Sequence, residues 1–302
     1  MNPLILELEQ LKKEKNAVIL AHYYANDEVQ QVADYIGDSF YLSKVATTVE
    51  QDTILFAGVS FMGESAKILN PEKRVLMPDL TADCPMAHMA TKEAIEKVRA
   101  EYDDLAVVCY INSVASLKCL SDVCVTSSNA MKIVKALPQK NIFFIPDENL
   151  GRYIASKVPE KNFIFNDGFC HVHASLKEED VIAAKKEYPN AEFLAHPECP
   201  MNILEHADFI GSTSEIIDYA TESSCQEFII GTEYGVFYEL KQRNPKKQFH
   251  GISVTQTCHN MKKNTLENMV KALKEGCNEV FVSDEVREQA QKPLNKMLEL
   301  AK

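Results

Sequence analysis

The chain has 302 residues, of which 32 are Lys or Arg and 44 are Asp or Glu, so its formal charge is −12. This acidic balance argues against nucleic acid as the main partner, because binding to phosphates needs a basic face. The content of 46% hydrophobic and 25% charged residues is typical of a globular protein and excludes a disordered or fibrous one.

The sequence carries no signal for a membrane or for export. No run approaches the roughly 20 uninterrupted apolar residues of a membrane span, and residues 1–16 mix Leu with Glu as an amphipathic helix does. The nine cysteines are an odd number spread along the chain, and no glycosylation sequon accompanies them. We therefore expect a cytoplasmic protein that binds neither a membrane nor nucleic acid.

After the N-terminal helix, apolar runs of strand length alternate with helical patterns along the chain. The runs are residues 17–22, 53–58, 74–78, 105–110, 141–146, 162–167, 191–196 and 227–232. A last helical pattern begins at about residue 284. This alternation predicts an α/β fold of parallel sheets covered by helices.

The chain also contains a threefold repeat, with landmarks at nearly equal spacing. Each unit starts with a polar residue at a strand end, and the starts are 88 and 86 residues apart. A hydroxyl residue follows after 17 residues, a proline after 49 and a cysteine after 60 to 62. These residues are, unit by unit, His22, Ser39, Pro71 and Cys84; Tyr110, Ser127, Pro159 and Cys170; and His196, Thr213, Pro245 and Cys258.

The repeat predicts three βαβαβα units around a pseudo-threefold axis. We expect them at residues 1–88 with the N-terminal helix, 89–174, and 175–302 with a C-terminal capping helix. Ligands of α/β sheets bind at the carboxyl ends of the strands, where the repeated residues lie. The active site should therefore lie at the central interface, where the three units face one another.

Three repeat-equivalent cysteines, Cys84, Cys170 and Cys258, are candidates to hold an iron–sulfur cluster. Three ligands on a four-iron cluster leave one iron open to a substrate. The other six are interpreted as core or incidental thiols: Cys109, Cys119, Cys124, Cys199, Cys225 and Cys277. Two alternatives stay open: a zinc hydrolase that uses the same thiolates, and a binding module that holds an anion beside a structural cluster.

The strand ends carry pairs of polar residues two positions apart, whose side chains point to the same side of the strand. The pairs are His22 with Tyr24, Tyr110 with Asn112, and His196 with Glu198. From these we predict Tyr24, Tyr110, His196 and Glu198 as the catalytic candidates, with Glu198 and His196 as the main proton-transfer pair. His173 is interpreted as a wall of the pocket and not as a metal ligand.

Hydroxyl side chains stand where helices are expected to begin, at Ser39, Ser127, Ser212 and Thr213, and we expect them to cap those helices. Helix N-termini also attract anions, and the strand-end motifs contain no Arg or Lys. The substrate is therefore predicted to be small and multiply anionic. Nucleotide-binding glycine motifs and the G-x-S-x-G hydrolase motif do not occur in the sequence.

Longer motifs add a family resemblance over nearly the whole chain. The most specific are AHYYANDEVQQVADYIGDS, FAGVSFMGESAKILNP, YINSVASLK, VTSSNA, PDENLG, GFCHVH, AHPEC, GSTSE and CHNMKKNTL. With these, the chain resembles the quinolinate synthases, iron–sulfur enzymes of NAD biosynthesis. The resemblance implies a triangular α/β architecture and a four-iron four-sulfur cluster on Cys84, Cys170 and Cys258.

The resemblance also implies the reaction and the residues that contact its substrates. Iminoaspartate would condense with dihydroxyacetone phosphate to give quinolinate, with release of phosphate and two waters, and an enzyme that produces iminoaspartate would be a functional partner. Tyr24 would take a catalytic role. The implied substrate contacts are His22, Ser39, Tyr110, Asn112, Ser127, His173, His196, Glu198 and Thr213.

Overall fold

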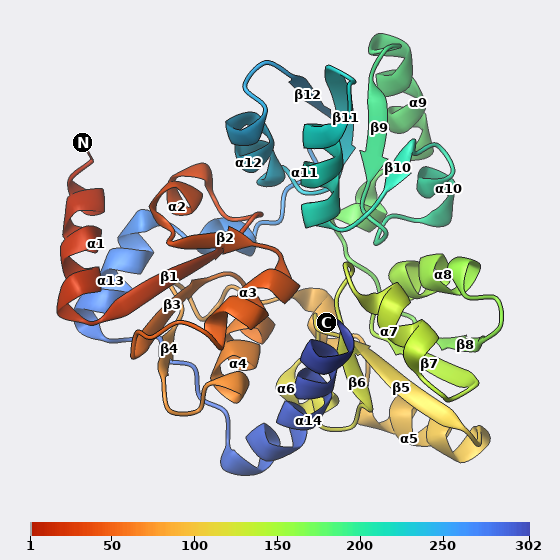
Figure 1. Ribbon diagram of the computed structural model, residues 1–302, viewed down its shortest axis with the longest axis horizontal. Helices are drawn as coiled ribbons and strands as arrows, with labels where there is room; N and C mark the ends of the chain where they lie inside the picture. Colours follow the sequence, from red (N-terminus) through yellow and green to blue (C-terminus); the bar gives the residue numbers. More distant parts are fainter. Residues whose placement is uncertain (1) are drawn as a thin grey trace.

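Three sheets of four parallel strands form the framework of the computed structural model, which describes residues 2–302 (Figure 1). The first sheet contains β1 (Ala17–His22), β2 (Tyr35–Gly37), β3 (Thr53–Ala57) and β4 (Arg74–Leu76). The second contains β5 (Leu105–Tyr110), β6 (Val123–Val125), β7 (Asn141–Ile145) and β8 (Asn162–Phe165). The third contains β9 (Glu192–Ala195), β10 (Phe209–Ile210), β11 (Glu227–Gly231) and β12 (Gln248–Gly251).

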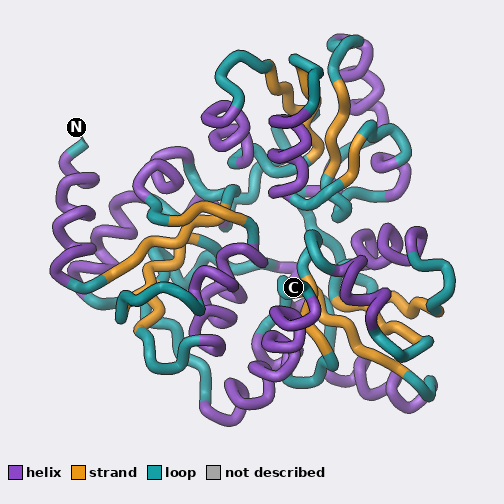
Figure 2. The backbone as a smooth tube through the Cα atoms, in the orientation of Figure 1, coloured by secondary structure: helices purple, strands orange, loops and turns teal. Residues whose placement is uncertain are grey.

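Helices surround each sheet and give the molecule three lobes (Figure 2). They are α1 (Pro3–Glu14), α2 (Asp27–Val32), α3 (Ser39–Ala46), α4 (Ser60–Leu69), α5 (Lys92–Glu101), α6 (Ala115–Lys118), α7 (Ala130–Ala136), α8 (Glu148–Lys157), α9 (Glu178–Glu187), α10 (Met201–Leu204), α11 (Thr213–Glu222), α12 (Val236–Arg243), α13 (Leu266–Glu275) and α14 (Asp284–Leu300). Short 3₁₀ helices are η1 (Pro85–His88), η2 (His173–Ser175) and η3 (Met261–Lys263). Within residues 2–302, no helix combines the length and apolar character needed to cross a membrane.

The predicted α/β architecture of three repeated units is confirmed. In each sheet the first strand lies between the second and the third, and the fourth follows the third. Each unit has four strands where the repeat predicts three, because the short segments β2, β6 and β10 pair at the edges of the sheets. These segments have only two or three residues, too few to show an alternating pattern. In the third unit β12 also lies outside the eight apolar runs.

Burial on both faces explains why the central strands are apolar throughout. All residues of β1 are buried. Strand β3 pairs with it residue by residue, from Ala17 opposite Thr53 to Ala21 opposite Ala57. Parallel strands covered by helices on both sides have no solvent-facing side, so they show no alternation of polar residues. Burial of each large apolar side chain contributes about 1.5–3 kcal/mol to folding.

The last two long helices pack on lobes other than the third. The buried residues Met269 and Leu273 of α13 share a cluster with Leu8 and Leu11 of α1, in the first lobe. Helix α14 packs against β6, α6 and α4, between the first and second lobes. The apolar faces of α13 and α14 thus pack the end of the chain against the first and second lobes. The predicted boundaries of the three units stay a prediction.

The first and third lobes touch closely beside the strand end of β1. The side-chain amide of Gln30 donates to the carbonyl oxygens of Tyr23 (2.9 Å) and Gly235 (2.9 Å). A Cβ on Gly235 would lie 2.6 Å from the Cα of Tyr24, so this approach of two backbones requires a glycine. The contact fixes Tyr24 relative to the third lobe.

Candidate active site

One cavity lies where the three lobes meet. All thirteen residues predicted for the site line it: His22, Tyr24, Ser39, Cys84, Tyr110, Asn112, Ser127, Cys170, His173, His196, Glu198, Thr213 and Cys258. They come from all three lobes, because the carboxyl ends of the central strands point toward one another.

The cavity separates the nine cysteines into two groups. Cys84, Cys170 and Cys258 line it, and the other six do not. Among the described residues no Lys or Arg lines it either, although Asp38 and Glu233 do. The cavity therefore combines three thiols with hydroxyls, imidazoles and carboxylates.

Two histidines at strand ends are held in the same way. Nδ1 of His22 accepts a hydrogen bond from the backbone N–H of Tyr24 (3.1 Å), and Nδ1 of His196 accepts one from that of Glu198 (3.3 Å). Burial lowers the pKa of both imidazoles to about 3. Both rings are therefore neutral at pH 7 and carry their proton on Nε2, which makes that atom a donor.

The hydroxyl of Tyr24 joins a chain of hydrogen bonds across the lobes. It lies 2.8 Å from Oγ1 of Thr213 and 2.7 Å from Oγ1 of Thr232. Oγ1 of Thr232 lies in turn 2.9 Å from Nε2 of His173. Burial, together with the charge of Glu198, raises the pKa of Tyr24 well above its usual value, so this phenol stays protonated at neutral pH.

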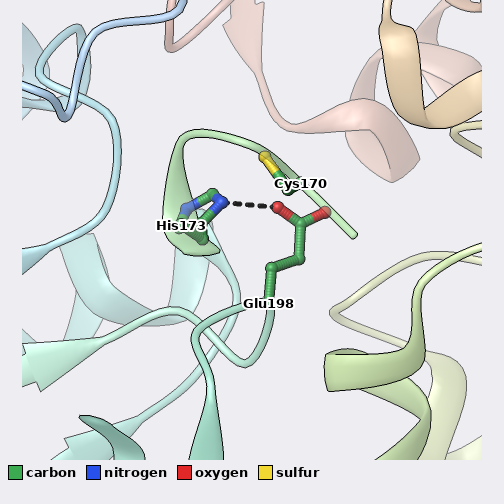
Figure 3. Close-up of side chains that lie close together, drawn as sticks. All are labelled: Cys170, His173 and Glu198. Atoms are coloured by element: carbon green, nitrogen blue, oxygen red, sulfur yellow. Dashed lines mark ion pairs between the residues drawn. The ribbon is translucent and has the colours of Figure 1, made fainter. Parts of the chain in front are cut away.

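His173 leads from this chain to a buried carboxylate. Figure 3 shows Nδ1 of His173 facing Glu198, whose Oε2 is 2.7 Å away, at ion-pair distance but off the line of an ideal hydrogen bond. Burial alone would raise the pKa of Glu198, but the neighbouring imidazole of His173 outweighs it and lowers that pKa. Glu198 is therefore a carboxylate, and its Oε1 has no hydrogen-bond partner.

The capping prediction is wrong for Ser39, Ser127 and Thr213. The residue before Ser39, Asp38, caps α3 through the backbone N–H of Tyr41 (2.9 Å). Ser212 caps α11 in the same way, as predicted, together with Glu215. Because another residue stands at each cap position, the three hydroxyls are free to line the cavity.

The three cavity cysteines share one local geometry. Each precedes a short 3₁₀ helix, and the backbone N–H three positions on, at Ala87, His173 and Met261, opposes the rise of the thiol pKa by stabilising the thiolate. Burial nevertheless raises the pKa of all three thiols. A negative charge on Cys258 raises the pKa of Cys84 further, and one on Cys84 raises the pKa of Cys170.

A smaller set of potential metal ligands lies within the same cavity. Ligand atoms of Cys170, His173 and Glu198 lie within 4.8 Å of one another (Figure 3). His173 was interpreted as a wall of the pocket from its sequence. In the structure His173 lies close enough to Cys170 and Glu198 to act either as a wall of the pocket or as a metal ligand.

Several residues of the site were missed in the sequence, among them Glu233, which lines the cavity, and Thr232, which bonds to Tyr24. Both directly follow β11. A signal for Glu233 was present in the repeat. Glu233 stands 37 residues after His196, and Asp147 stands 37 residues after Tyr110. Both acidic residues at this repeat position are fully buried; Asp147 caps α8, whereas Glu233 lines the cavity.

Comparison with known proteins assigns the chain to a family. The family model described as quinolinate synthetase A protein matches residues 6–299. The chain belongs to the quinolinate synthase family. It is 55% identical over 294 residues to the quinolinate synthase of Fusobacterium nucleatum, an alignment that covers 97% of this chain and 98% of that one.

Two further quinolinate synthases are similar over nearly their full length. The one from Caldicellulosiruptor saccharolyticus is 52% identical over 295 residues, which are 98% of this chain and 97% of the relative. The one from Clostridioides difficile is 50% identical over 298 residues, with 99% and 98% coverage. As a member of the quinolinate synthase family, the chain is an enzyme.

Proposed function

We propose that this chain condenses iminoaspartate with dihydroxyacetone phosphate to form quinolinate, phosphate and two waters, as a step of NAD biosynthesis. The product keeps the four carbons of iminoaspartate and the three of the triose, joined by one new carbon–carbon and one new carbon–nitrogen bond. The atoms balance without an oxidant or a reductant. The reaction therefore requires that the protein bind anions, transfer protons and assist the departure of water and phosphate.

One observation carries this proposal: the cavity gathers buried polar atoms that have no partner within the protein. Oδ1 of Asn112 and Oε1 of Glu198 are buried and make no hydrogen bond. Leaving such atoms unpaired costs about 1–3 kcal/mol each. A polar ligand that pairs with them would recover this energy, which is typical of a substrate site.

Hydroxyls and neutral donors would hold the anionic groups of the substrates. Ser39 and Thr213 are the first residues of α3 and α11, whose N-termini carry partial positive charge. Nε2–H of His22 and of His196 would donate to carboxylate oxygens. Because no side chain in this set is charged, the site would bind its substrates without neutralising the carboxylate of Glu198.

Protons would move along the hydrogen bonds that converge on Tyr24 and Glu198. The Tyr24 phenol would donate a proton to a leaving oxygen and recover it through Thr232 and His173. Glu198 would accept protons from substrate carbon or nitrogen, with His173 stabilising its charge. Tyr110, whose side chain helps to lower the pKa of Glu198, would orient that carboxylate.

Cys84, Cys170 and Cys258 would hold a four-iron four-sulfur cluster, with one iron left open. Their common position before a 3₁₀ helix, the backbone N–H facing each sulfur and their place on one cavity support this assignment. When bound, the cluster would supply a Lewis acid that polarises a substrate oxygen. None of the nine cysteines forms a disulfide, and we place the enzyme in the reducing cytoplasm.

A second candidate uses one metal ion on Cys170, His173 and Glu198. The 4.8 Å spread of their ligand atoms favours it, because thiolate, imidazole and carboxylate together are a zinc ligand set. Such an enzyme would be a hydrolase and would need neither Cys84 nor Cys258. The two candidates therefore differ in the cysteines on which metal binding depends.

The test is anaerobic reconstitution with iron and sulfide, followed by metal analysis and an assay for quinolinate. We expect about four iron and four sulfide per chain, and quinolinate from dihydroxyacetone phosphate and iminoaspartate formed from oxaloacetate and ammonium. His173→Gln should keep the iron, and Cys84→Ser should lose it. Zinc that survives Cys84→Ser but not His173→Gln would replace this proposal with the hydrolase. Stoichiometric cluster without turnover would favour the binding module.

A further inference from the structure

An acidic side chain lies behind each of the three cavity cysteines, close to the backbone N–H of the cysteine itself. Oε1 of Glu233 accepts the N–H of Cys258 at 3.0 Å, and Oδ1 of Asp83 accepts that of Cys84 at 2.8 Å. Burial raises the pKa of Asp147 well above its usual value, and the nearby backbone N–H of Cys170 opposes that rise. These backbone contacts act on the loops that carry the sulfurs and not on the sulfurs.

The three acidic residues differ in burial and in their position in the repeat. Asp147 and Glu233 occupy the same repeat position, just after β7 and β11, and both have 0% exposure. The first unit has Val59 at this position, and the half-exposed Asp83 next to Cys84 provides the contact instead. Glu233 makes the most complete set of bonds, since one oxygen of Asp147 has no partner.

Glu233 connects the Cys258 loop to the third sheet. Its Oε2 accepts the backbone N–H of Gly235 at 2.6 Å, and its Oε1 lies 3.1 Å from Nζ of Lys262. The carboxylate therefore bonds to a residue just after β11, to the cysteine and to the residue four positions beyond that cysteine. A charged acceptor with three donors is a strong anchor in a buried place.

Lys262 extends this anchor to the first lobe. Its ammonium donates to the carbonyl oxygen of Tyr24 at 2.8 Å, and its own carbonyl accepts from the side chain of Asn26 at 3.1 Å. A cysteine loop of the third lobe and the backbone of Tyr24 are thus joined through one ion pair. The Coulomb attraction is strong because Glu233 is excluded from water.

We propose that Glu233 and Lys262 are a positioning pair that holds Cys258 in place against Tyr24. The inference rests on the proposed function for the role of Cys258 and adds residues that the sequence motifs left without a role. Removal of the pair would loosen the Cys258 loop while leaving Cys84 and Cys170 in place.

The loop has a second support that should keep such variants folded. The side-chain amide of Gln256 donates to the carbonyls of Ile230 (2.8 Å) and Thr232 (2.7 Å), and its oxygen accepts from the backbone N–H of Ile252 (2.6 Å). This network is independent of Glu233. The charge of Glu233 can therefore be removed by Glu233→Gln without loss of the loop as a whole.

The experiment compares Glu233→Gln, Lys262→Met and Lys262→Arg with the wild-type chain. The matched control is Glu64→Gln, because Oε2 of Glu64 also accepts a backbone N–H, that of Ala115 at 2.8 Å, but not behind a cysteine. The first measurement is alkylation of the cluster-free chain with iodoacetamide, with the rate at each cysteine followed by mass spectrometry. The second is the loss of cluster absorbance under excess EDTA after reconstitution.

We expect Glu233→Gln and Lys262→Met to speed alkylation of Cys258 relative to Cys84 at least about tenfold, the effect of losing one charge-assisted bond from a loop. Cluster loss should be about 10- to 100-fold faster, as for other residues that orient a metal ligand. Lys262→Arg should restore both rates to within a few-fold, and Glu64→Gln should match the wild type.

An unchanged Cys258 to Cys84 ratio in both Glu233→Gln and Lys262→Met would overturn the proposal. So would an equal acceleration at all three cysteines, which would mean general unfolding. If Glu233→Gln fails to fold, Lys262→Met decides, because Lys262 is partly exposed. A wild-type chain that takes up no iron would overturn the cluster assignment alone, since the alkylation ratio still decides on the pair.

Discussion

Tyr24 and Thr232 share a hydrogen bond of 2.7 Å between their hydroxyl oxygens, although 208 residues separate them along the chain. The bond joins the first lobe to the third at the cavity. It forms because β1 and β11 end side by side there and because Gly235 allows the two backbones to touch. Thr232 then connects Tyr24 to Nε2 of His173.

The variant Thr232→Val tests this connection, because it keeps the shape of the side chain and removes the hydroxyl. Tyr24 would keep its bond to Thr213 but lose its link to His173. We expect turnover to fall at least about tenfold, with iron content unchanged. Thr221→Val, which removes a hydroxyl bonded only within the third lobe, is the control. Equal turnover in the two variants would remove Thr232 from the proton path.

Loss of the phenol itself should have a larger effect. We expect Tyr24→Phe to lower kcat by about 10²- to 10⁴-fold, the usual contribution of a general acid. Iron and sulfide per chain should stay at the wild-type level, because the ring and its packing remain. Tyr41→Phe is a matched control at an exposed tyrosine. Wild-type kcat in Tyr24→Phe would end its assignment as a catalytic residue.

Removal of one cavity cysteine should abolish both the cluster and activity. We expect Cys170→Ala to bind less than one iron per chain after reconstitution and to form no quinolinate. Cys277→Ala, a half-buried cysteine outside the cavity, should keep both. Iron analysis and the visible spectrum check this prediction. A fully active Cys170→Ala variant would contradict the whole cluster assignment.

Neutral His22 should make the stability of the fold depend on pH. Its pKa is about 3 in the folded chain, lowered by burial, against 6.5 when exposed. Below pH 6.5 the unfolded chain gains a proton that the folded chain does not, so the free energy of unfolding falls by about 1.4 kcal/mol per pH unit. Between pH 7 and pH 5 this loss is about 2 kcal/mol.

We expect His22→Gln to remove this part of the pH dependence, whatever its stability at pH 7. The measurement is urea unfolding of both proteins at pH 7 and pH 5. The wild-type chain should lose about 2 kcal/mol more than the variant over this interval. Equal losses would show that His22 is protonated in the folded chain.

The contact at Gly235 should matter for activity as well as for stability. In Gly235→Ala the new Cβ would meet the backbone of Tyr24 at 2.6 Å and force the lobes apart. We expect a loss of about 1–3 kcal/mol of stability and of turnover by up to about a hundredfold, since a shift of 1 Å misplaces a catalytic group.

The control for this variant is Gly276→Ala, at the end of α13. Gly276 has a φ of 62°, but an added Cβ there would meet no atom closer than 3.4 Å. It should cost about 1–2 kcal/mol through backbone strain and leave kcat unchanged. Unaltered kcat in Gly235→Ala would mean that the close approach of the lobes does not position Tyr24.

Much of the fold could be predicted because its pattern is local and repeated. Apolar runs such as those of β1 and β7 predict buried parallel strands without information from the rest of the chain. The edge strand β10 could not be predicted, since its two residues pair only because β9 lies beside them. The packing of α13 on α1 also depends on distant apolar faces, which no local pattern identifies.

The helix caps show a similar limit. A hydroxyl near the start of a helix fits the cap position and the next position equally well in a sequence. At Ser39 and Thr213 the preceding residue takes the cap, which leaves these hydroxyls in the cavity. A shift of one residue thus changes a structural role into a place at the site.

The sequence by itself determined the three units, the strand ends and the three cysteines, because equal spacing in parallel α/β units puts equivalent residues at the same edge. Tertiary structure alone decided that Tyr24 meets Thr232 and that Glu233 and Lys262 stand between Cys258 and Tyr24. These pairs come from different units or from the two ends of a loop. Their contact depends on how the lobes dock, and docking is set by packing across the interface and not by any periodicity along the chain.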